Sequence, residues 1–358
     1  MNKMKEWIKK SPVLHFWGRV IQNCKSAGYR QSVIDISEHP AMVRIEKKGE
    51  LFPDRLFYLI HLDDTGQNSG FFALFNQTLK RLELAKRLNA APFIIWIHSA
   101  YSDRTIKNTQ NVYEYYFVQP GDIDYSELQK ASNIIISKST DGFYLSNDSL
   151  YLQLENHLEE VVKIYRRYIR LRESVRSDIQ LDITNSGLYA HFENIIGVHV
   201  RGTDYTARWK GHPVPVTLEE YVTATKQQMA KMHIDEVFLA TDDKRAVRCF
   251  QAEFGDHLHF FDDVARGEGE QGVHYLKAER PHHQYRMGYE VLRDVYTLAQ
   301  CKGFIGGMSQ VGFAVRVINM AEFKKFEGEQ VIDKGINEKG VSSARMNRIF
   351  AKEMINEK

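Results

Sequence analysis

Residues 195–204, IIGVHVRGTD, combine an apolar run with a cluster of polar and charged side chains. The apolar start is typical of a buried strand. Ligands of open α/β sheets bind at the carboxyl ends of the strands, which is where His199, Arg201 and Asp204 would lie. A guanidinium offers a planar fork of donors suited to phosphate. From this stretch alone, a surface turn with an Arg–Asp ion pair is an equal alternative.

Two later strands predicted in the same half also end in polar groups. Residues 237–240 (VFLA) precede Thr241, Asp242 and Asp243, and residues 303–307 (GFIGG) lead into Ser309 and Gln310 at a predicted helix start. Glycines at a strand end, followed by a helix N-terminus, form a ready anion site. The three strand ends together predict a nucleotide diphosphate ligand. The dinucleotide fingerprint and the Walker phosphate loop are both absent from the sequence, which favours a nucleotide sugar.

The first half of the chain carries a βαβ pattern. Apolar runs at residues 56–60 and 93–97 flank a polar loop and a helical periodicity from Phe72 to Ala85. Such a crossover implies a parallel sheet. A third strand is predicted at residues 134–136, a long amphipathic helix at 150–172, and a domain boundary between 182 and 194. A nucleotide sugar bound between two βαβ domains fits this organisation.

Composition excludes several classes of function. The chain has 358 residues, 43% of them hydrophobic and 26% charged, as in a soluble globular protein. A net charge of +2 gives no electrostatic reason to expect nucleic acid. Three distant cysteines indicate a reducing compartment rather than a disulfide framework. No apolar run is long enough for a membrane span. Neither Asp63–Asp64 nor the histidines at 274, 282 and 283 have a spacing that favours a metal over a solvated loop.

Three segments, in order, resemble motifs of the α-1,6-fucosyltransferase family, which shares them with the α-1,2- and protein O-fucosyltransferases. Residues 197–204 (GVHVRGTD) resemble the first motif and residues 237–243 (VFLATDD) the second. The stretch from Asp294 to Ser309-Gln310-Val311 is similar to the third. The likeness covers about residues 195–320. It is far more specific than any one motif.

The resemblance implies a GT-B architecture, in which two Rossmann-like domains hold a nucleotide-sugar cleft between them. The expected domains are residues 1–188 on the acceptor side and 189–340 around the GDP-sugar, with a tail, 341–358, packing back on the first domain. Arg201 would contact the diphosphate of GDP-fucose, together with Ser309 and Gln310. His199 and Asp294 would read the guanine, and Asp242 and Asp243 would lie near the nucleotide and fucose. The resemblance also implies metal-independent chemistry and no cofactor besides the donor substrate.

The sequence departs from the family after Arg201. The α-1,6 members usually carry a second arginine where this chain has Gly202, and a lysine where it has Tyr205. The glutamate proposed as their base has no counterpart in residues 206–213. An inverting displacement needs a base for the acceptor proton. Asp204, His212 and Glu219 are the candidates, although Asp204 could instead orient Arg201.

These features together predict an inverting fucosyltransferase that converts GDP-β-L-fucose and a glycan acceptor into an α-fucoside, in bacterial surface glycan synthesis. Two alternatives stay open: a GT-B transferase that uses another nucleotide sugar, and a glycan- or nucleotide-binding relative without turnover. A cytoplasmic location is expected. Contact with the inner face of the membrane through residues 7–17 stays open against a loosely packed first helix. The sequence leaves the acceptor, the linkage and the oligomeric state undetermined.

Overall fold

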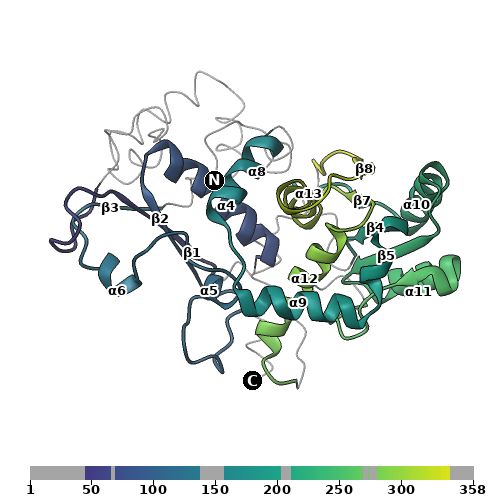
Figure 1. The fold of residues 1–358 in the computed structure, drawn as a ribbon, viewed down its shortest axis with the longest axis horizontal. Coiled ribbons are helices and arrows are strands. Elements are labelled where there is room, and N and C mark those ends of the chain that lie inside the picture. The colour runs from purple at the N-terminus through teal and green to yellow at the C-terminus, as the bar shows by residue number, and fades with distance from the viewer. Residues whose placement is uncertain are drawn as a thin grey trace, which may run out of the picture.

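A computed structural model describes residues 45–65, 69–137, 157–202, 211–268, 273 and 280–338. It contains two parallel sheets, one of three strands in the order β2-β1-β3 and one of five in the order β6-β5-β4-β7-β8. Figure 1 shows the two sheets on opposite sides of a central group of helices. The predicted α/β class, with a parallel sheet in each half of the chain, is confirmed.

The first half forms the smaller sheet and the helices around it. Strand β1 pairs with β2 in parallel from Phe57↔Ala91 to Asp63↔Ile97, and the intervening α4 makes the predicted βαβ crossover. The core side of α4 packs phenylalanines against Trp96, whose indole N–H donates to Thr78 Oγ1 at 2.9 Å. The elements are β1 (Phe57–Asp63), α4 (Phe71–Arg87), β2 (Ala91–Ile97), α5 (Tyr113–Tyr116), α6 (Tyr125–Leu128), β3 (Ile134–Ile136), α8 (Leu158–Tyr168) and α9 (Glu173–Asn185).

The second half places β4 at the centre of the larger sheet, with every residue of that strand buried. Helix α10 begins with a capping box between Thr217 and Glu220. The elements are η3 (Leu188–Ala190), η4 (Phe192–Asn194), β4 (Ile195–Val200), α10 (Leu218–Met232), β5 (Glu236–Thr241), α11 (Lys244–Phe254), η6 (Gly255–His257), β6 (Leu258–His259), α12 (His283–Leu298), β7 (Gly303–Gly307), α13 (Gln310–Glu322) and β8 (Gly328–Ile332).

Two expectations about these elements need correction. The long helix predicted to reach residue 172 ends as α8 at Tyr168, because Ile169 is extended and Leu171 makes an antiparallel bridge to Phe117. A separate helix, α9, then follows; the predicted start of the long helix, 150–156, lies outside the described residues. Strand β8, which pairs with β7 from Gly303↔Gly328 to Gly307↔Ile332, was not predicted, because its half-exposed residues lack an apolar run.

Helices of both halves pack directly on each other. Helix α13 contacts α4 and α8, and α12 contacts α9. Between them lies a polar cluster in which the hydroxyls of Tyr165 and Tyr296 lie 2.6 Å apart and both contact Oε1 of Glu322. Arg176 on α9 completes it with an ion pair to Glu322 at 3.0 Å. The helical layer therefore fixes the second sheet against the first half, while the predicted domain limits stay a prediction.

No helix in the described ranges is long and apolar enough to span a membrane.

Candidate functional site

The three polar strand ends predicted in the second half lie side by side. Strand β4 pairs with β5 through Val200↔Thr241 and with β7 through His199↔Gly306. The residues after each strand therefore emerge at one edge of the sheet, where α13 also begins. Tyr221, a residue outside the predicted site, joins two of these ends, because its buried hydroxyl bonds to the backbone of Gly307 and Arg201.

Arg201 is held by a carboxylate from the neighbouring strand end. Its Nη1 donates to Asp242 Oδ2 at 3.2 Å, and the other oxygen, Oδ1, accepts from the backbone N–H of Gly202 at 2.9 Å. One side chain thus fixes both the guanidinium and the main chain that follows it. The Arg201 side chain keeps 26% of its surface exposed, so it is anchored yet accessible at the sheet edge.

The Asp243 carboxylate caps α11 and pairs with Arg245. It is buried, and its Oδ1 caps α11 by accepting from the Arg245 N–H at 2.8 Å. The Arg245 guanidinium clamps the same carboxylate from Nε at 3.0 Å and Nη2 at 2.7 Å. A Cβ on Gly202 would approach the Asp243 Cβ to 2.2 Å, which no real contact allows. Gly202 is therefore required by the position of Asp243, and a larger residue cannot enter without moving it.

Introducing an arginine at position 202 should therefore destabilise this protein. Gly202→Arg is expected to displace Asp243 and to destabilise the fold by roughly 1–3 kcal/mol, the usual effect of overpacking. Thermal unfolding measures the change. Gly121→Ala is the matched control, because a Cβ there meets its nearest atom at an ordinary 3.6 Å. A Gly202→Arg protein as stable as the wild type would contradict this packing argument.

His199 and Ser309 form the buried floor of the site. Ser309 Oγ accepts from the Gly312 N–H at 2.9 Å as the N-cap of α13, and it lies 3.5 Å from His199 Nδ1. In this contact the serine hydroxyl donates to Nδ1 in one tautomer of the neutral imidazole, and the ring N–H donates to Oγ in the other. Burial lowers the pKa of His199 to about 4, with Arg201 contributing in the same direction and Asp242 opposing. At neutral pH the site therefore contains an uncharged imidazole beside an arginine.

The lowered pKa of His199 should appear in the pH dependence of stability. Between about pH 6.5 and about 4 the unfolded histidine binds a proton that the folded one does not, so the free energy of unfolding falls as pH falls through this window. Above about pH 6.5 the contribution of His199 to the free energy of unfolding is constant. We expect the His199 ring signals in NMR spectra to stay unchanged between pH 5.5 and 8. A midpoint near 6.5 would contradict the buried neutral assignment.

Asp294 lies on α12, which packs against β4 and β5. Its side chain is 7% exposed, and burial raises its pKa to about 7, although the charges of Arg293 and Arg266 oppose the rise. Arg266 belongs to the segment after β6. The next residue, Gly267, donates its N–H to the Asp242 carbonyl at 2.9 Å. The segment that contains Arg266 is therefore bonded to the strand end that carries Asp242.

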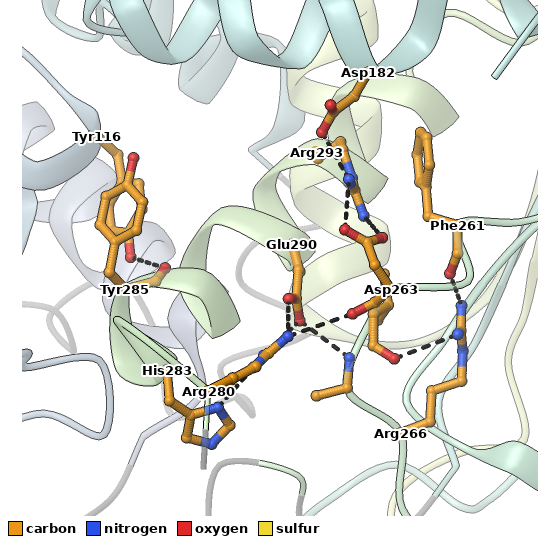
Figure 2. Close-up of polar contacts among 12 residues, drawn as sticks. Tyr116, Asp182, Phe261, Asp263, Arg266, Arg280, His283, Tyr285, Glu290 and Arg293 are labelled. Carbon is orange, nitrogen blue, oxygen red and sulfur yellow. Dashed lines mark hydrogen bonds and ion pairs between the residues drawn. The ribbon is translucent and has the colours of Figure 1, made fainter. Parts of the chain in front are cut away.

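Figure 2 shows how the segment after β6 is fastened to α12 and α9. Arg293 pairs with Asp182 at 2.7 Å and with Asp263, and its guanidinium lies 3.9 Å from the centre of the Phe261 ring. Arg280 pairs with Glu290 of α12. The loop of residues 266–284 is thus anchored at its ends. Most of its middle lies outside the described residues.

Gln310, at the first position of α13, is held from the first half of the chain. Asn76 on α4 donates through Nδ2 to the Gln310 carbonyl at 2.9 Å and to its Oε1 at 2.8 Å. This partner did not figure among the predicted site residues. A polar asparagine within the apolar face of α4, between Phe75 and Leu79, is the signal that could have identified it.

The proposed catalytic bases are placed only in part. Asp204 lies outside the described residues. His212 lies in a segment that pairs with the chain after β8, since its carbonyl accepts from the Asn337 N–H at 2.8 Å. Glu219 is in the first turn of α10. Asp242 supplies a carboxylate that orients Arg201. Within the described ranges no group of three or more histidine, cysteine or acidic residues could hold a metal ion.

A cavity of about 600 Å³ lies away from these strand ends. It is lined by the end of α4, the start of β2 and the turn at Pro120 to Asp122. It adjoins the amino end of β2 in the smaller sheet, whereas the polar strand ends belong to the larger sheet. It forms no part of the candidate site.

No protein-family model matches the chain, and no curated protein matches it either. Among solved structures it is similar to NodZ α-1,6-fucosyltransferase co-crystallised with GDP, at 16% identity over 73% of this chain and 92% of that one, with a TM-score of 0.43. It is also similar to fucosyltransferase NodZ from Bradyrhizobium, at 17% identity over 73% of this chain and 93% of that one, with a TM-score of 0.41. A third similar structure is POFUT1 in complex with GDP, at 11% identity over 78% of this chain and 98% of that one, with a TM-score of 0.43. Both belong to the fucosyltransferase superfamily that the three motifs resemble, and at these scores neither carries weight for the donor or the acceptor of this chain.

Proposed function

We propose that the protein is an inverting glycosyltransferase that transfers L-fucose from GDP-β-L-fucose to a glycan acceptor. The observation that supports this most is the convergence at one sheet edge of an anchored arginine, a neutral histidine and a capped helix N-terminus. The ends of β4, β5 and β7 supply these groups through His199, Arg201 and Ser309. The motifs that resemble the fucosyltransferases lie at the same edge.

The leaving group explains the arginine. As the bond between the sugar C1 and the β-phosphate oxygen breaks, negative charge grows on the departing GDP. A guanidinium already oriented by Asp242 stabilises that charge without reorganisation, and does so more in the transition state than in the ground state. The N-terminus of α13 adds main-chain donors for the same anion.

Asp294 suits the guanine base. Guanine presents two adjacent donors, N1–H and the 2-amino group, and an ionised carboxylate can accept from both. Asp294 is buried and makes no hydrogen bond to the described residues, and burial holds its pKa near 7. Hydrogen bonds that a ligand donates to the carboxylate would favour its ionised form and lower this pKa. A uracil base has no such pair of donors, so the same carboxylate would discriminate against UDP.

In the displacement the acceptor oxygen attacks C1 from the face opposite to the phosphate, and its proton passes to a protein base. Asp204, His212 and Glu219 stay the candidates for that base. The acceptor is a glycan hydroxyl. The bacterial surface glycan and the cytoplasmic location expected from the sequence belong to this proposal as well.

Turnover with a panel of nucleotide sugars tests the donor. GDP-fucose should be hydrolysed slowly without an acceptor, releasing GDP, whereas UDP-sugars should not be consumed. GDP-mannose as a preferred donor would point to the first alternative, a transferase for another nucleotide sugar. Binding of GDP without any turnover, even with glycan mixtures, would favour the second, a binding protein. Equal consumption of every nucleotide sugar would contradict the proposal.

A further inference from the structure

Asn76 makes both of its amide-nitrogen hydrogen bonds to one residue of the other half. Its Nδ2 donates to the carbonyl and to the side-chain oxygen of Gln310, at 2.9 and 2.8 Å. Asn76 has no exposed surface, whereas Gln310 is partly exposed at the first position of α13. A buried donor on α4 thus reaches across to the helix start that borders the anion site.

The bond to the main-chain carbonyl fixes which way the Asn76 amide faces, since only its nitrogen can donate there. The Gln310 side chain must then turn its oxygen, not its nitrogen, toward Asn76. The Gln310 Nε2 group, a donor, is left on the other corner of the planar amide. The contact therefore determines that Gln310 offers N–H groups, rather than a carbonyl oxygen, to whatever binds beside it.

An asparagine at position 76 lowers the stability of the fold. Its Oδ1 is buried and accepts no hydrogen bond from the described residues. A buried unsatisfied acceptor destabilises a fold, and an apolar residue would suit the packing of α4 between Phe75 and Leu79 better. Orientation of Gln310 accounts for the presence of an amide at this position.

We infer that Asn76 is a positioning residue that sets the rotamer of Gln310 and thereby couples the first half of the chain to diphosphate binding. The inference rests on the proposed function, since it takes Gln310 to donate to the diphosphate. It concerns Asn76 acting through Gln310, not contact between Asn76 and the ligand.

A double-mutant cycle tests this coupling. The dissociation constant of GDP is measured by calorimetry for wild type, Asn76→Ala, Gln310→Ala and the double variant. Asn76→Ala and Gln310→Ala should each lower the affinity for GDP about 10-fold, the typical effect of losing one hydrogen bond to a charged group. In the double variant the loss should equal that of Gln310→Ala alone. Guanosine, which lacks the diphosphate, should bind all four proteins equally.

Asn319→Ala provides the matched control. Asn319 is also fully buried, on α13, the helix that begins at Gln310. Its Nδ2 donates to two carbonyls, those of Ala299 and Lys324, each at 2.8 Å. Its replacement should lower the melting temperature at least as much as Asn76→Ala does, with the GDP affinity unchanged.

The two hypotheses fail in different ways. If the wild type does not bind GDP, the proposed function is wrong. Suppose instead that the wild type binds GDP. If the two losses of GDP affinity add in the double variant, or if the affinity for guanosine falls in parallel with that for GDP, Asn76 is merely structural and the inference is overturned.

Discussion

Replacing Arg201 with alanine should lower kcat/KM for GDP-fucose by roughly 10²–10³-fold, as the loss of one preorganised donor to a developing anion does. Most of the loss should fall on kcat, because the charge on the leaving diphosphate is largest in the transition state. Arg201→Lys should recover little of the activity, because an ammonium cannot bond both to Asp242 and to the diphosphate in the same plane.

The fold should survive this change. Arg201 is partly exposed, and the ion pair it makes with Asp242 is of the kind that contributes about 0–1 kcal/mol. Arg316→Ala is a suitable control, since Arg316 also pairs with a carboxylate, Glu329 at 2.8 Å, in the same half. Glu329 pairs in register with Phe304 near the start of β7, away from the polar strand ends. Steady-state kinetics and thermal unfolding measure both variants. Unchanged turnover in Arg201→Ala would refute its assigned role.

Asp294→Asn should change which base the protein prefers. The amide keeps one acceptor and gains a donor, so it cannot satisfy both donors of guanine. Xanthine presents N1–H beside a carbonyl, which matches the amide. We expect GDP affinity to fall about 10²-fold and xanthosine diphosphate to become the better ligand, because two hydrogen bonds are exchanged. Competition binding with the two nucleotides gives the ratio directly.

The same variant has an independent signature in stability. The folded wild type keeps the Asp294 proton up to about pH 7, whereas the unfolded chain loses it near about pH 4. The free energy of unfolding should therefore fall as pH rises through this window, and Asp294→Asn should lack that contribution. If Asp294→Asn lowered the affinities for GDP and xanthosine diphosphate equally, Asp294 would not contribute to recognition of the base.

The strand ends were predictable because buried strands leave a simple apolar signature. Residues 195–198, 237–240 and 303–307 are continuous apolar or glycine runs, and parallel pairing brings their ends together without further information. Strand β8 lacks such a run, since it lies at the edge of the sheet. The end of α8 depends on a tertiary bridge between Leu171 and Phe117, which no local pattern records.

The partners of the site residues were harder to predict. Asn76 is 234 positions away from Gln310, and Arg245 and Tyr221 act through hydrogen bonds that depend on the packing of whole elements. Sequence periodicity identifies which residues are buried, but it does not identify which buried polar groups meet. Gly202 is an instructive case, because no local pattern explains the glycine and the position of Asp243 does.

Calorimetric titration of the wild-type protein with GDP and with UDP is the most direct test of the account. We predict saturable binding of GDP at micromolar concentrations, weakened in Arg201→Ala, and no measurable heat with UDP. Equal binding of the two nucleotides, or none of either, would contradict the claim that this sheet edge is a guanosine diphosphate site.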